Sequence, residues 1–449
     1  MTVVDATSQR VIGVGVGPFN LGLAALLDPV PDVDATFFDA GDDFAWHAGL
    51  LIDGVSLQVP FLADLVTLAD PTSRHSYLNY LHEHARLYRF YFYEHFHIPR
   101  REYDAYCRWV AHRLTSIRFA SRVEQVEPVS ASDPVDGAPS SWRVTVTTPS
   151  GTREELVADH VVLGVGTRPV VPECARPALG DHVFHSAEYL SHRAAVLTTR
   201  RVTVVGSGQS AAEIVADLLE HAPGTEVAWF TRSRGFFPME YSKLGLEHFS
   251  PEYTSYFHAL DGARRDEIRR GQDLLYKGIS AETSNRIFDV LYERSIDGGN
   301  VPLRYAAACE LRSVAPAGST GCLTLHFDHQ DQHAEFTHDT DTLVLATGYE
   351  PSPLPVAPGV LALDAHGRPE VTRDYRFVGV DGTPLSVYAQ NAELHTHGVG
   401  APDLGLGAHR NAVIVNAITG RDEYAVHDHN VFQEFGVPVG TTNTIVERT

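Results

Sequence analysis

The chain has 449 residues, too many for one ordinary hydrophobic core, so we expect two or three domains. Its net charge of −22 argues against nucleic acid or an anionic membrane as main partner; it would suit a cationic substrate but is equally the ordinary acidity of a cytosolic protein. The four cysteines lack zinc-site or disulfide spacing and no apolar run approaches the roughly 20 residues that span a bilayer, so we expect a cytoplasmic protein.

A glycine-rich turn follows the first predicted strand. Gly15, Gly17, Pro18 and Asn20 lie between an apolar β-branched run and an apolar helical pattern. Glycines allow a tight turn, and the helix N-terminus offers free N–H groups to a pyrophosphate. The next strand ends in Asp39, whose carboxylate can accept hydrogen bonds from a ribose diol. An aspartate at a strand end is often only a turn residue, but the distance from Gly15 favours the ribose.

The same order of elements returns in the second half of the chain. An aromatic-rich segment over 44–110 and strand-like runs near 122–129, 142–148 and 159–167 come first. A second turn then contains Gly206, Gly208, Gln209 and Ser210, and its next strand is followed by Arg232. An acid suits an unmodified ribose and an arginine suits a 2′-phosphate, so we expect FAD in the first half and NADPH in the second. On spacing alone, Arg232 could equally be an ordinary charged residue of the protein surface.

The pattern predicts an α/β fold with two Rossmann-like dinucleotide-binding domains and a smaller helical, substrate-binding region. A helical insertion follows the second unit, and a later apolar strand ending in Thr347, Gly348 and Tyr349 is expected to return the chain to the first domain. The expected divisions are an FAD-binding domain over 1–198 and 341–449, an NADPH-binding domain over 199–235 and 299–340, and the insertion over 236–298.

Longer motifs connect the chain to a known family. It resembles the flavin-dependent N-hydroxylating monooxygenases of siderophore biosynthesis, which act on lysine, ornithine or diamines, and it is most similar to the cadaverine and putrescine enzymes. The resemblance covers nearly the whole length and rests on these segments: GVGPFNL from Gly15, FAWH from Phe44, LQVPFL from Leu57, DLVTLADP from Asp64, IPRREY from Ile98, GSGQSAAE from Gly206, ATGY from Ala346, HTHG from His395 and LGLGAHR from Leu404.

The resemblance implies a reaction. NADPH reduces FAD, O2 adds at the flavin C4a, and the hydroperoxide passes one oxygen to a primary amine while NADP+ stays bound. The amine must react as the free base although its pKa in water is about 10.4, and a desolvated pocket favours that form. The cofactor carries the chemistry, so no acid–base dyad is required. The relatives are often homo-oligomers, so we expect a dimer or tetramer.

The resemblance also implies roles for individual residues. Gln58 and Arg100 are the expected catalytic residues, with Gln58 beside the flavin and Arg100 near the nicotinamide. The remaining cofactor-binding residues are expected to be Trp46, His47, Gln209, Ser210, Arg232, Thr347, Gly348, Tyr349, Leu404, Gly405 and Leu406, with the glycine turns and Asp39. Trp46 and Tyr349 could instead be core aromatics, and Arg100 with Arg101 could be a solvated pair. His395 and His397 look like a metal pair, but no third ligand is evident and we predict no metal.

One departure from the family bears on the substrate. The ornithine and lysine enzymes carry a lysine that pairs with the substrate carboxylate, and Ala63 stands in its place. A buried carboxylate without a cation would be costly, so a diamine such as cadaverine or putrescine is favoured. Lys243 or Lys277 in the insertion could substitute, which keeps lysine N6-hydroxylation open.

A diamine brings a second ammonium group. On location alone, Glu240 and Glu247, with Leu246 between them in the chain, are candidates for this part of the substrate site, although solvated surface glutamates are as common. Gly405 is a second departure, because relatives usually have serine there. Two further alternatives are a flavin disulfide reductase, which would need a redox cysteine pair that the chain lacks, and a non-catalytic NADPH or flavin sensor.

Overall fold

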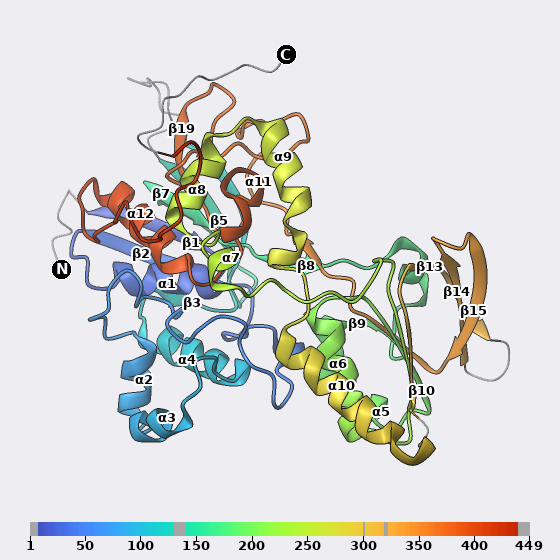
Figure 1. Cartoon of the computed structure of the whole chain (residues 1–449). Helices are drawn as coiled ribbons and strands as arrows, with labels where there is room; N and C mark the ends of the chain where they lie inside the picture. Colours follow the sequence, from blue (N-terminus) through green and yellow to red (C-terminus); the bar gives the residue numbers. More distant parts are fainter. Residues whose placement is uncertain (1–7, 130–140, 300, 318–321, 439–449) are drawn as a thin grey trace.

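The computed structural model describes residues 8–129, 141–299, 301–317 and 322–438. Figure 1 shows two lobes with the short strand β8 (Thr167–Pro169) between them. Each lobe is built on a mainly parallel sheet, and the chain returns from the second lobe through β17 (Tyr349–Pro351). Strands β8 and β17 pair antiparallel. The α/β class with two dinucleotide-type sheets is therefore confirmed.

The first domain is built on a six-stranded sheet. Its strands are parallel except for the β18–β19 pair, and their spatial order is β18 (Arg376–Val378), β19 (Pro384–Ala389), β7 (His160–Leu163), β1 (Gln9–Val14), β2 (Val33–Phe38) and β3 (Ile117–Arg118). Alternate residues of β1 face different cores. Val11 packs in the core with α1 (Pro18–Leu27) and α12 (Gly407–Thr419). Ile12 and Val14 pack against the antiparallel strands β4 (Arg122–Pro128), β5 (Trp142–Thr147) and β6 (Arg153–Ala158).

The second domain is built on a five-stranded parallel sheet. Its order is β12 (Leu303–Ala306), β11 (Glu226–Phe230), β10 (Arg201–Val205), β16 (Thr342–Leu345) and β9 (Val183–His185). One face is covered by α5 (Tyr189–Val196), α6 (Gln209–His221) and α10 (Ala281–Ser295). The antiparallel strands β13 (Cys309–Ala317), β14 (Cys322–His329) and β15 (Ala334–Thr340) pack on the other.

This sheet corrects the expected domain limits. We expected 1–198 and 341–449 to form the first domain, but β9 and β16 lie within those ranges and belong to the second sheet, where β16 pairs with β10 and β9 pairs with β16. The strand over 342–345 is buried along its whole length, as expected for a central strand of a parallel sheet. Its apolar sequence does not reveal which of the two similar sheets the strand joins. The chain returns to the first domain only after β16.

The helical insertion expected over 236–298 is divided between the domains. Helices α7 (Lys243–Leu246), α8 (Pro251–Ala259) and α9 (Gly262–Gly271) come first, and Phe257 of α8 packs with Val399 of the first domain beside α11 (Leu394–His397). Ile287 of α10 packs in the core of the second domain. Figure 1 shows α8 and α9 in the upper part of the first lobe and α10 alongside α6.

Three further helices, α2 (Tyr77–Glu83), α3 (Leu87–Tyr93) and α4 (Arg100–Arg113), complete the first domain. None of the helices in the described ranges is long and apolar enough to cross a membrane.

Candidate functional site

The first glycine turn requires glycine at one position and leaves open space at another. Gly15 has a φ of +84°, and a Cβ there would stand 2.4 Å from the Gly164 carbonyl oxygen. A Cβ at Gly17, the N-cap of α1, would meet no described atom within 4 Å. The buried Asn20 donates from Nδ2 to the Gly15 carbonyl at 2.8 Å, which explains an asparagine where a generic motif has glycine. The turn thus presents the α1 N-terminus to open space, as an anion site requires.

Asp39 lies directly against this turn. It follows β2, and its Oδ2 accepts a 2.7 Å hydrogen bond from the Val16 backbone N–H while Oδ1 accepts one from Gly41. The carboxylate therefore lies at the edge of the expected nucleotide site, with its position fixed by backbone donors.

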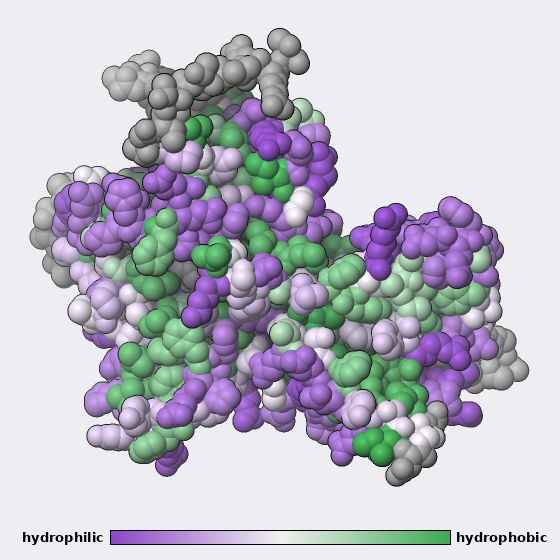
Figure 2. Space-filling view, in the orientation of Figure 1, coloured by the Kyte–Doolittle hydropathy of each residue, from purple (hydrophilic) through white to green (hydrophobic). Residues whose placement is uncertain are grey.

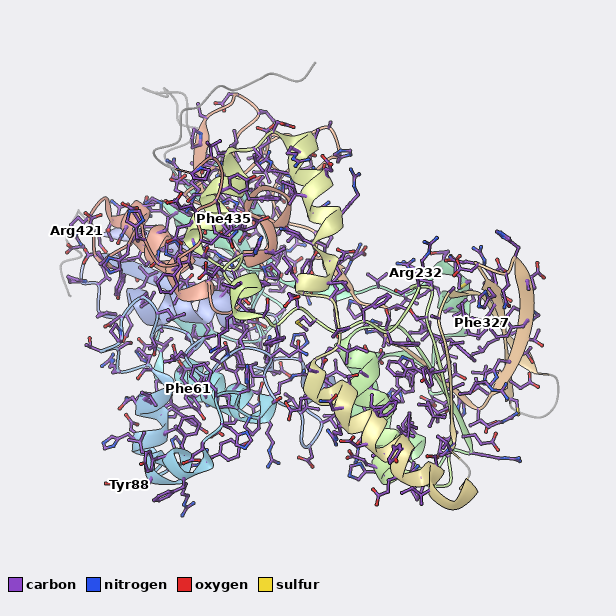
Figure 3. All side chains as sticks on the ribbon, viewed as in Figure 1. Phe61, Tyr88, Arg232, Phe327, Arg421 and Phe435 are labelled. Carbon is purple, nitrogen blue, oxygen red and sulfur yellow. The ribbon has the colours of Figure 1, made fainter. Side chains whose placement is uncertain are left out.

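The second turn repeats this geometry in the other domain. Gly206 has a φ of +144°, and a Cβ there would meet the Ala346 carbonyl oxygen at 2.1 Å. Gly208 is the N-cap of α6, and Ser210 lies in its first turn. The exposed Arg232 follows β11, and the neighbouring Ser233 accepts a 3.0 Å hydrogen bond from Ser207 of the turn. Figure 3 shows Arg232 in the second lobe, far across the molecule from Phe61 in the first.

Arg100 is buried and ion-paired, so it does not form a solvated pair with the exposed Arg101. Its guanidinium donates to both carboxylate oxygens of Glu213, at 2.8 and 2.6 Å, and to the Leu50 carbonyl at 3.1 Å. Gln209 also has protein partners: its Nε2 donates to Glu213 and to Thr283, each at 2.9 Å. Both residues expected at NADPH therefore belong to one hydrogen-bond network.

The expected flavin end contains an unusual donor. The buried Nε2 of Gln58 has no hydrogen-bond partner among the described residues. A buried N–H group left unpaired is costly, so a ligand acceptor at this position would satisfy it.

Trp46, His47 and Tyr349 form an aromatic cluster. The rings of Trp46 and His47 make an edge contact with centroids 4.7 Å apart, and His47 also approaches Tyr349. His47 keeps contact with solvent, but the surrounding protein and the nearby Arg100 charge lower its pKa to about 4. The ring is therefore neutral at physiological pH. Trp46 and Tyr349 are only half-buried, which fits a lining role better than a core role.

The segments that follow β16 and α11 complete this region. Gly348 has a φ of +86°, and its carbonyl is 3.1 Å from His185 Nε2. Thr347 donates its hydroxyl to the Val170 carbonyl. Leu404 is half-buried and Leu406 is buried, both directly before α12.

Ala63 and Gly405 form a corner that contains an unexpected acid. A Cβ at Gly405 would stand 3.9 Å from the Ala63 Cβ and 2.8 Å from Asp403 Oδ1. Asp403 is half-buried, and its Oδ1 accepts a 2.7 Å hydrogen bond from the Gly405 N–H. Burial raises its pKa to about 6 despite backbone hydrogen bonds and the charge of Arg410. Burial raises the pKa of Tyr241 to about 12, and the negative charge of Asp403 contributes to this rise.

The structure gives the other substrate candidates different surroundings. Exposed Glu240 accepts a 2.6 Å hydrogen bond from the Ser242 N–H, and Glu247 accepts one of 2.7 Å from Gln433. Leu246 is 38% exposed on α7. Lys277 is ion-paired with Asp273 at 2.7 Å. Lys243 is exposed on α7.

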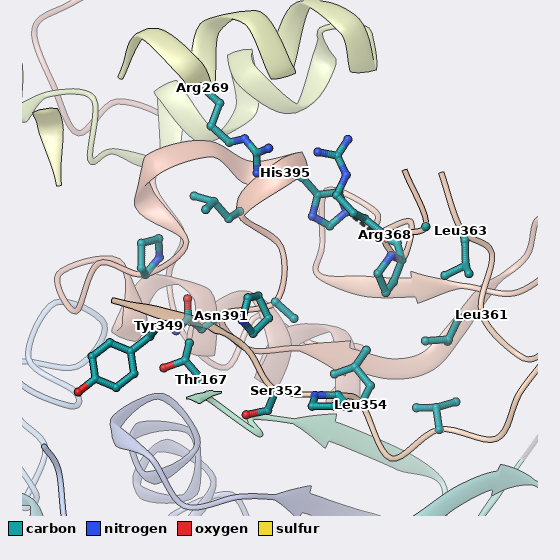
Figure 4. A pocket seen from close by; sticks show the side chains of 18 of the residues that line it. Thr167, Arg269, Tyr349, Ser352, Leu354, Leu361, Leu363, Arg368, Asn391 and His395 are labelled. Atoms are coloured by element: carbon teal, nitrogen blue, oxygen red, sulfur yellow. Dashed lines mark hydrogen bonds between the residues drawn. The ribbon is translucent and has the colours of Figure 1, made fainter. Parts of the chain in front are cut away.

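A cavity of about 900 Å³ adjoins the site (Figure 4). Tyr349 and Thr167 line it at the connecting strands, and Arg269 of α9 and Arg368 line the opposite wall. It also includes Lys277, whose carbonyl lies 3.7 Å from a Cβ placed on Gly208. Tyr349 thus belongs to both this cavity and the aromatic cluster, whereas Gln58 and Ala63 are not among the residues that line the cavity.

The two histidines that resemble a metal pair have backbone partners. His395 Nε2 is 2.8 Å from the Pro369 carbonyl, and His397 Nε2 is 3.4 Å from the Arg373 carbonyl. In the ranges that the structure describes, no group of three or more His, Cys, Asp or Glu is arranged to hold a metal ion.

Sequence reasoning gave no role to two residues that the structure places in this site. Glu213 was part of a recognised motif, but its partner Arg100 is distant in sequence. Asp403 lies two residues before Gly405. The glycine at a position where relatives usually have serine was the sequence feature that could have drawn attention to Asp403.

Comparisons with known proteins identify the family. Residues 8–351 match the model for L-lysine 6-monooxygenase/L-ornithine 5-monooxygenase. A rhizobactin siderophore biosynthesis protein of Rhizobium meliloti is 46% identical, and the alignment covers 97% of each chain. A putrescine N-hydroxylase of Acinetobacter baumannii is 40% identical, over 97% of this chain and 95% of the relative.

The solved structures agree. A cadaverine monooxygenase of the desferrioxamine pathway of Erwinia amylovora, bound to FAD, has a TM-score of 0.89 and 40% identity over 97% of this chain and 100% of that one. An ornithine N-hydroxylase of Kutzneria with reduced FAD, NADP+ and L-ornithine has a TM-score of 0.84 and 28% identity over 92% and 99%. The resemblance predicted from the motifs is confirmed, and this chain belongs to the L-lysine 6-monooxygenase/L-ornithine 5-monooxygenase family.

Proposed function

We propose that this protein uses FAD, NADPH and O2 to hydroxylate one amino group of a diamine, cadaverine or putrescine, for the biosynthesis of a hydroxamate siderophore. The observation that carries the choice of substrate is the corner of Ala63, Gly405 and Asp403, which offers a carboxylate and has alanine at the position of the family's carboxylate-binding lysine. The printed names of the putrescine and cadaverine relatives support the same choice.

The first domain fits FAD. The Gly15–Gly17 turn and the α1 N-terminus suit its pyrophosphate, and Asp39 suits the adenosine ribose. Gln58 has a free buried donor for the isoalloxazine, with Trp46, His47 and Leu404 to Leu406 as its surroundings. When bound and reduced, FAD would activate O2 for transfer of one oxygen atom to the amine.

The second domain fits NADPH. Gly206 and Gly208 allow close approach at the α6 N-terminus, and Ser210 lies in the first turn of that helix. Arg232 is exposed at the end of β11, where a 2′-phosphate would lie. Tyr349 and Thr347 in the connecting segment would face the junction between the two cofactors.

The substrate corner can separate the two ends of a diamine. Asp403 would pair with the distal ammonium, because a charge-assisted hydrogen bond to a half-buried carboxylate is stronger than a neutral one. The reacting amine would lie toward Gln58 and the aromatic cluster, where exclusion of water by the bound cofactors would favour its free base. The half-buried carboxylate of Asp403 would repel the carboxylate of an amino acid. Neither Glu240 nor Glu247 is needed for this arrangement.

Hydroxylamine production by the FAD-loaded enzyme tests the proposal. Cadaverine, putrescine, L-lysine and L-ornithine are compared at equal concentration with NADPH and air. We expect product from a diamine at a kcat/KM at least tenfold above that from either amino acid. Turnover of lysine well above both diamines would overturn the choice of substrate and favour the alternative, L-lysine N6-monooxygenase, which the family model also includes.

We also propose that the protein acts in the cytoplasm as a homo-oligomer, a dimer or a tetramer. The support is the exposed aromatic surface of α3, where Tyr88, Tyr91 and Phe92 are 80%, 71% and 73% exposed. Figure 2 shows apolar surface at this α2–α3 end of the first lobe. Light scattering on the purified protein measures the mass, and a monomer at micromolar concentration would contradict the oligomer.

A further inference from the structure

A segment of the first domain is built into the second. Leu50, Ile52 and Val55 belong to the hydrophobic core around α5 and α6. The approach is close, because a Cβ on Gly49 would stand 1.7 Å from the Ala187 carbonyl oxygen. The two domains therefore meet through packed backbone and side chains, and not only through the connecting strands β8 and β17.

Arg100 extends from α4 into this contact. Its backbone N–H donates to the Val55 carbonyl at 2.9 Å, and its guanidinium donates to the Leu50 carbonyl. The same guanidinium crosses to the second domain and binds both oxygens of Glu213 on α6. The side chains of Arg100 and Glu213 are only 10% and 1% exposed. Bidentate, charge-assisted pairing of this kind fixes orientation as well as distance.

Glu213 has a second partner at the nucleotide turn. Its Oε1 accepts a hydrogen bond from Gln209, the first residue of α6. Gln209 in turn binds Thr283 and accepts a 2.8 Å hydrogen bond from the Ser280 N–H at the start of α10. One carboxylate thus joins α4 of the first domain to the N-terminus of α6 and, through Gln209, to α10.

We propose that Glu213 is a positioning residue that couples the two cofactor domains: its carboxylate clamps Arg100 and Gln209 and thereby sets where the nicotinamide lies relative to the flavin. This inference rests on the proposed use of FAD and NADPH. Glu213 need not touch either cofactor. The charge of Arg100 already acts on the aromatic cluster: it helps to lower the pKa of His47, and it opposes the burial that raises the pKa of Tyr349. Glu213 therefore holds a charge beside the place where the two cofactors would meet.

Geometry at this junction should matter to the rate. Hydride transfer needs reacting atoms about 3–3.5 Å apart, and a misplacement of about 1 Å can slow a reaction by about 10²-fold. Glu213→Gln removes the charge and places an amide N–H₂ against either Arg100 or Gln209. We expect the rate constant of flavin reduction at saturating NADPH to fall by about tenfold or more, per bound FAD.

Glu220→Gln is the matched control. Glu220 is on the same helix and forms a bidentate ion pair with Arg286 of α10, wholly within the second domain. Its loss should change the reduction rate less than twofold. If Glu213→Gln does not retain FAD, Glu213→Asp keeps the charge but shortens the side chain, and it should also slow reduction severalfold. A reduction rate within twofold of wild type in a Glu213 variant that retains FAD would overturn the proposal.

Hydrogen–deuterium exchange supplies a readout without NADPH or amine. In FAD-loaded Glu213→Gln, amides over 48–55 and at the start of α6 should exchange at least fivefold faster than in wild type, while Glu220→Gln should not change 48–55. Unchanged exchange at 48–55 in Glu213→Gln would also overturn the coupling role. Failure of the proposed function would look different, because wild-type enzyme would then fail to be reduced by NADPH or to hydroxylate any amine.

Discussion

At the scale of single residues, substrate choice depends on the charge of Asp403. Its pKa is raised to about 6, mainly by burial, so the carboxylate is charged above that pH and becomes neutral below it. The KM for the diamine should therefore rise as the pH falls through about 6. Hydrogen bonds to charged groups contribute about 1.5–3 kcal/mol, so Asp403→Asn should raise this KM by roughly 10- to 100-fold at pH 8.

The asparagine variant should also lose the pH dependence of KM near pH 6, which steady-state kinetics over pH 5–9 would measure. Glu240→Gln is the control, because that glutamate is exposed and its carboxylate accepts a hydrogen bond from Ser242 of the same loop. A diamine KM that Asp403→Asn leaves unchanged at pH 8 would show that the distal ammonium binds elsewhere.

A substitution at Ala63 provides a second test of the substrate corner formed with Gly405 and Asp403. Ala63 is 5% exposed and lies across Gly405 from the Asp403 carboxylate. Ala63→Lys would place an ammonium where we expect the substrate's own, and the new cation could pair with Asp403. We expect diamine kcat/KM to fall by about tenfold or more while flavin reduction by NADPH stays within twofold of wild type. Stopped-flow reduction and a hydroxylamine assay separate these effects, and unaltered diamine turnover would place Ala63 away from the substrate.

At the scale of elements, substitutions at the two glycines of the first turn should have different effects. Gly15→Ala forces a side chain into a left-handed conformation and against the Gly164 carbonyl, so the apoprotein itself should lose about 1–3 kcal/mol of stability. A Cβ at Gly17 meets nothing in the structure, and only a bound pyrophosphate would contact it.

Gly17→Ala should therefore leave the melting temperature of the apoprotein within 1–2 °C, whereas FAD affinity should fall by about tenfold or more. Calorimetry of the apoprotein and fluorescence titration with FAD give the two quantities. Equal FAD affinity in Gly17→Ala and wild type would mean that the pyrophosphate does not approach this turn.

Elements were easier to predict than their partners. The turns at Gly15 and Gly206 stand out because strand, glycine and helix patterns coincide over a short stretch. The strand over 342–345 was recognised but assigned to the wrong sheet, since pairing between β10 and β16 joins residues far apart in sequence. For the same reason the sequence did not reveal that Glu213 binds Arg100, or that the 236–298 insertion is divided between two cores.

At the scale of the whole molecule, the two domains should not be independent in stability. Ile52 belongs by sequence to the first domain, yet it is 3% exposed in the core of the second. Ile98 is 1% exposed in the core of the first domain and provides a matched control. Replacing either isoleucine by alanine leaves a cavity, with an expected cost of about 2–4 kcal/mol.

The two variants should destabilise different parts of the molecule. Ile52→Ala should speed amide exchange in α5 and α6 of the second domain, because their packing partner is lost, whereas Ile98→Ala should act on α1 and α4. Hydrogen–deuterium exchange resolved by peptide measures this directly. Faster exchange only in the first domain for Ile52→Ala would mean that the 48–55 segment does not support the second core. The expected result would show that the loop preceding Gln58 links flavin site and nucleotide domain through packing, in addition to the Arg100–Glu213 ion pair.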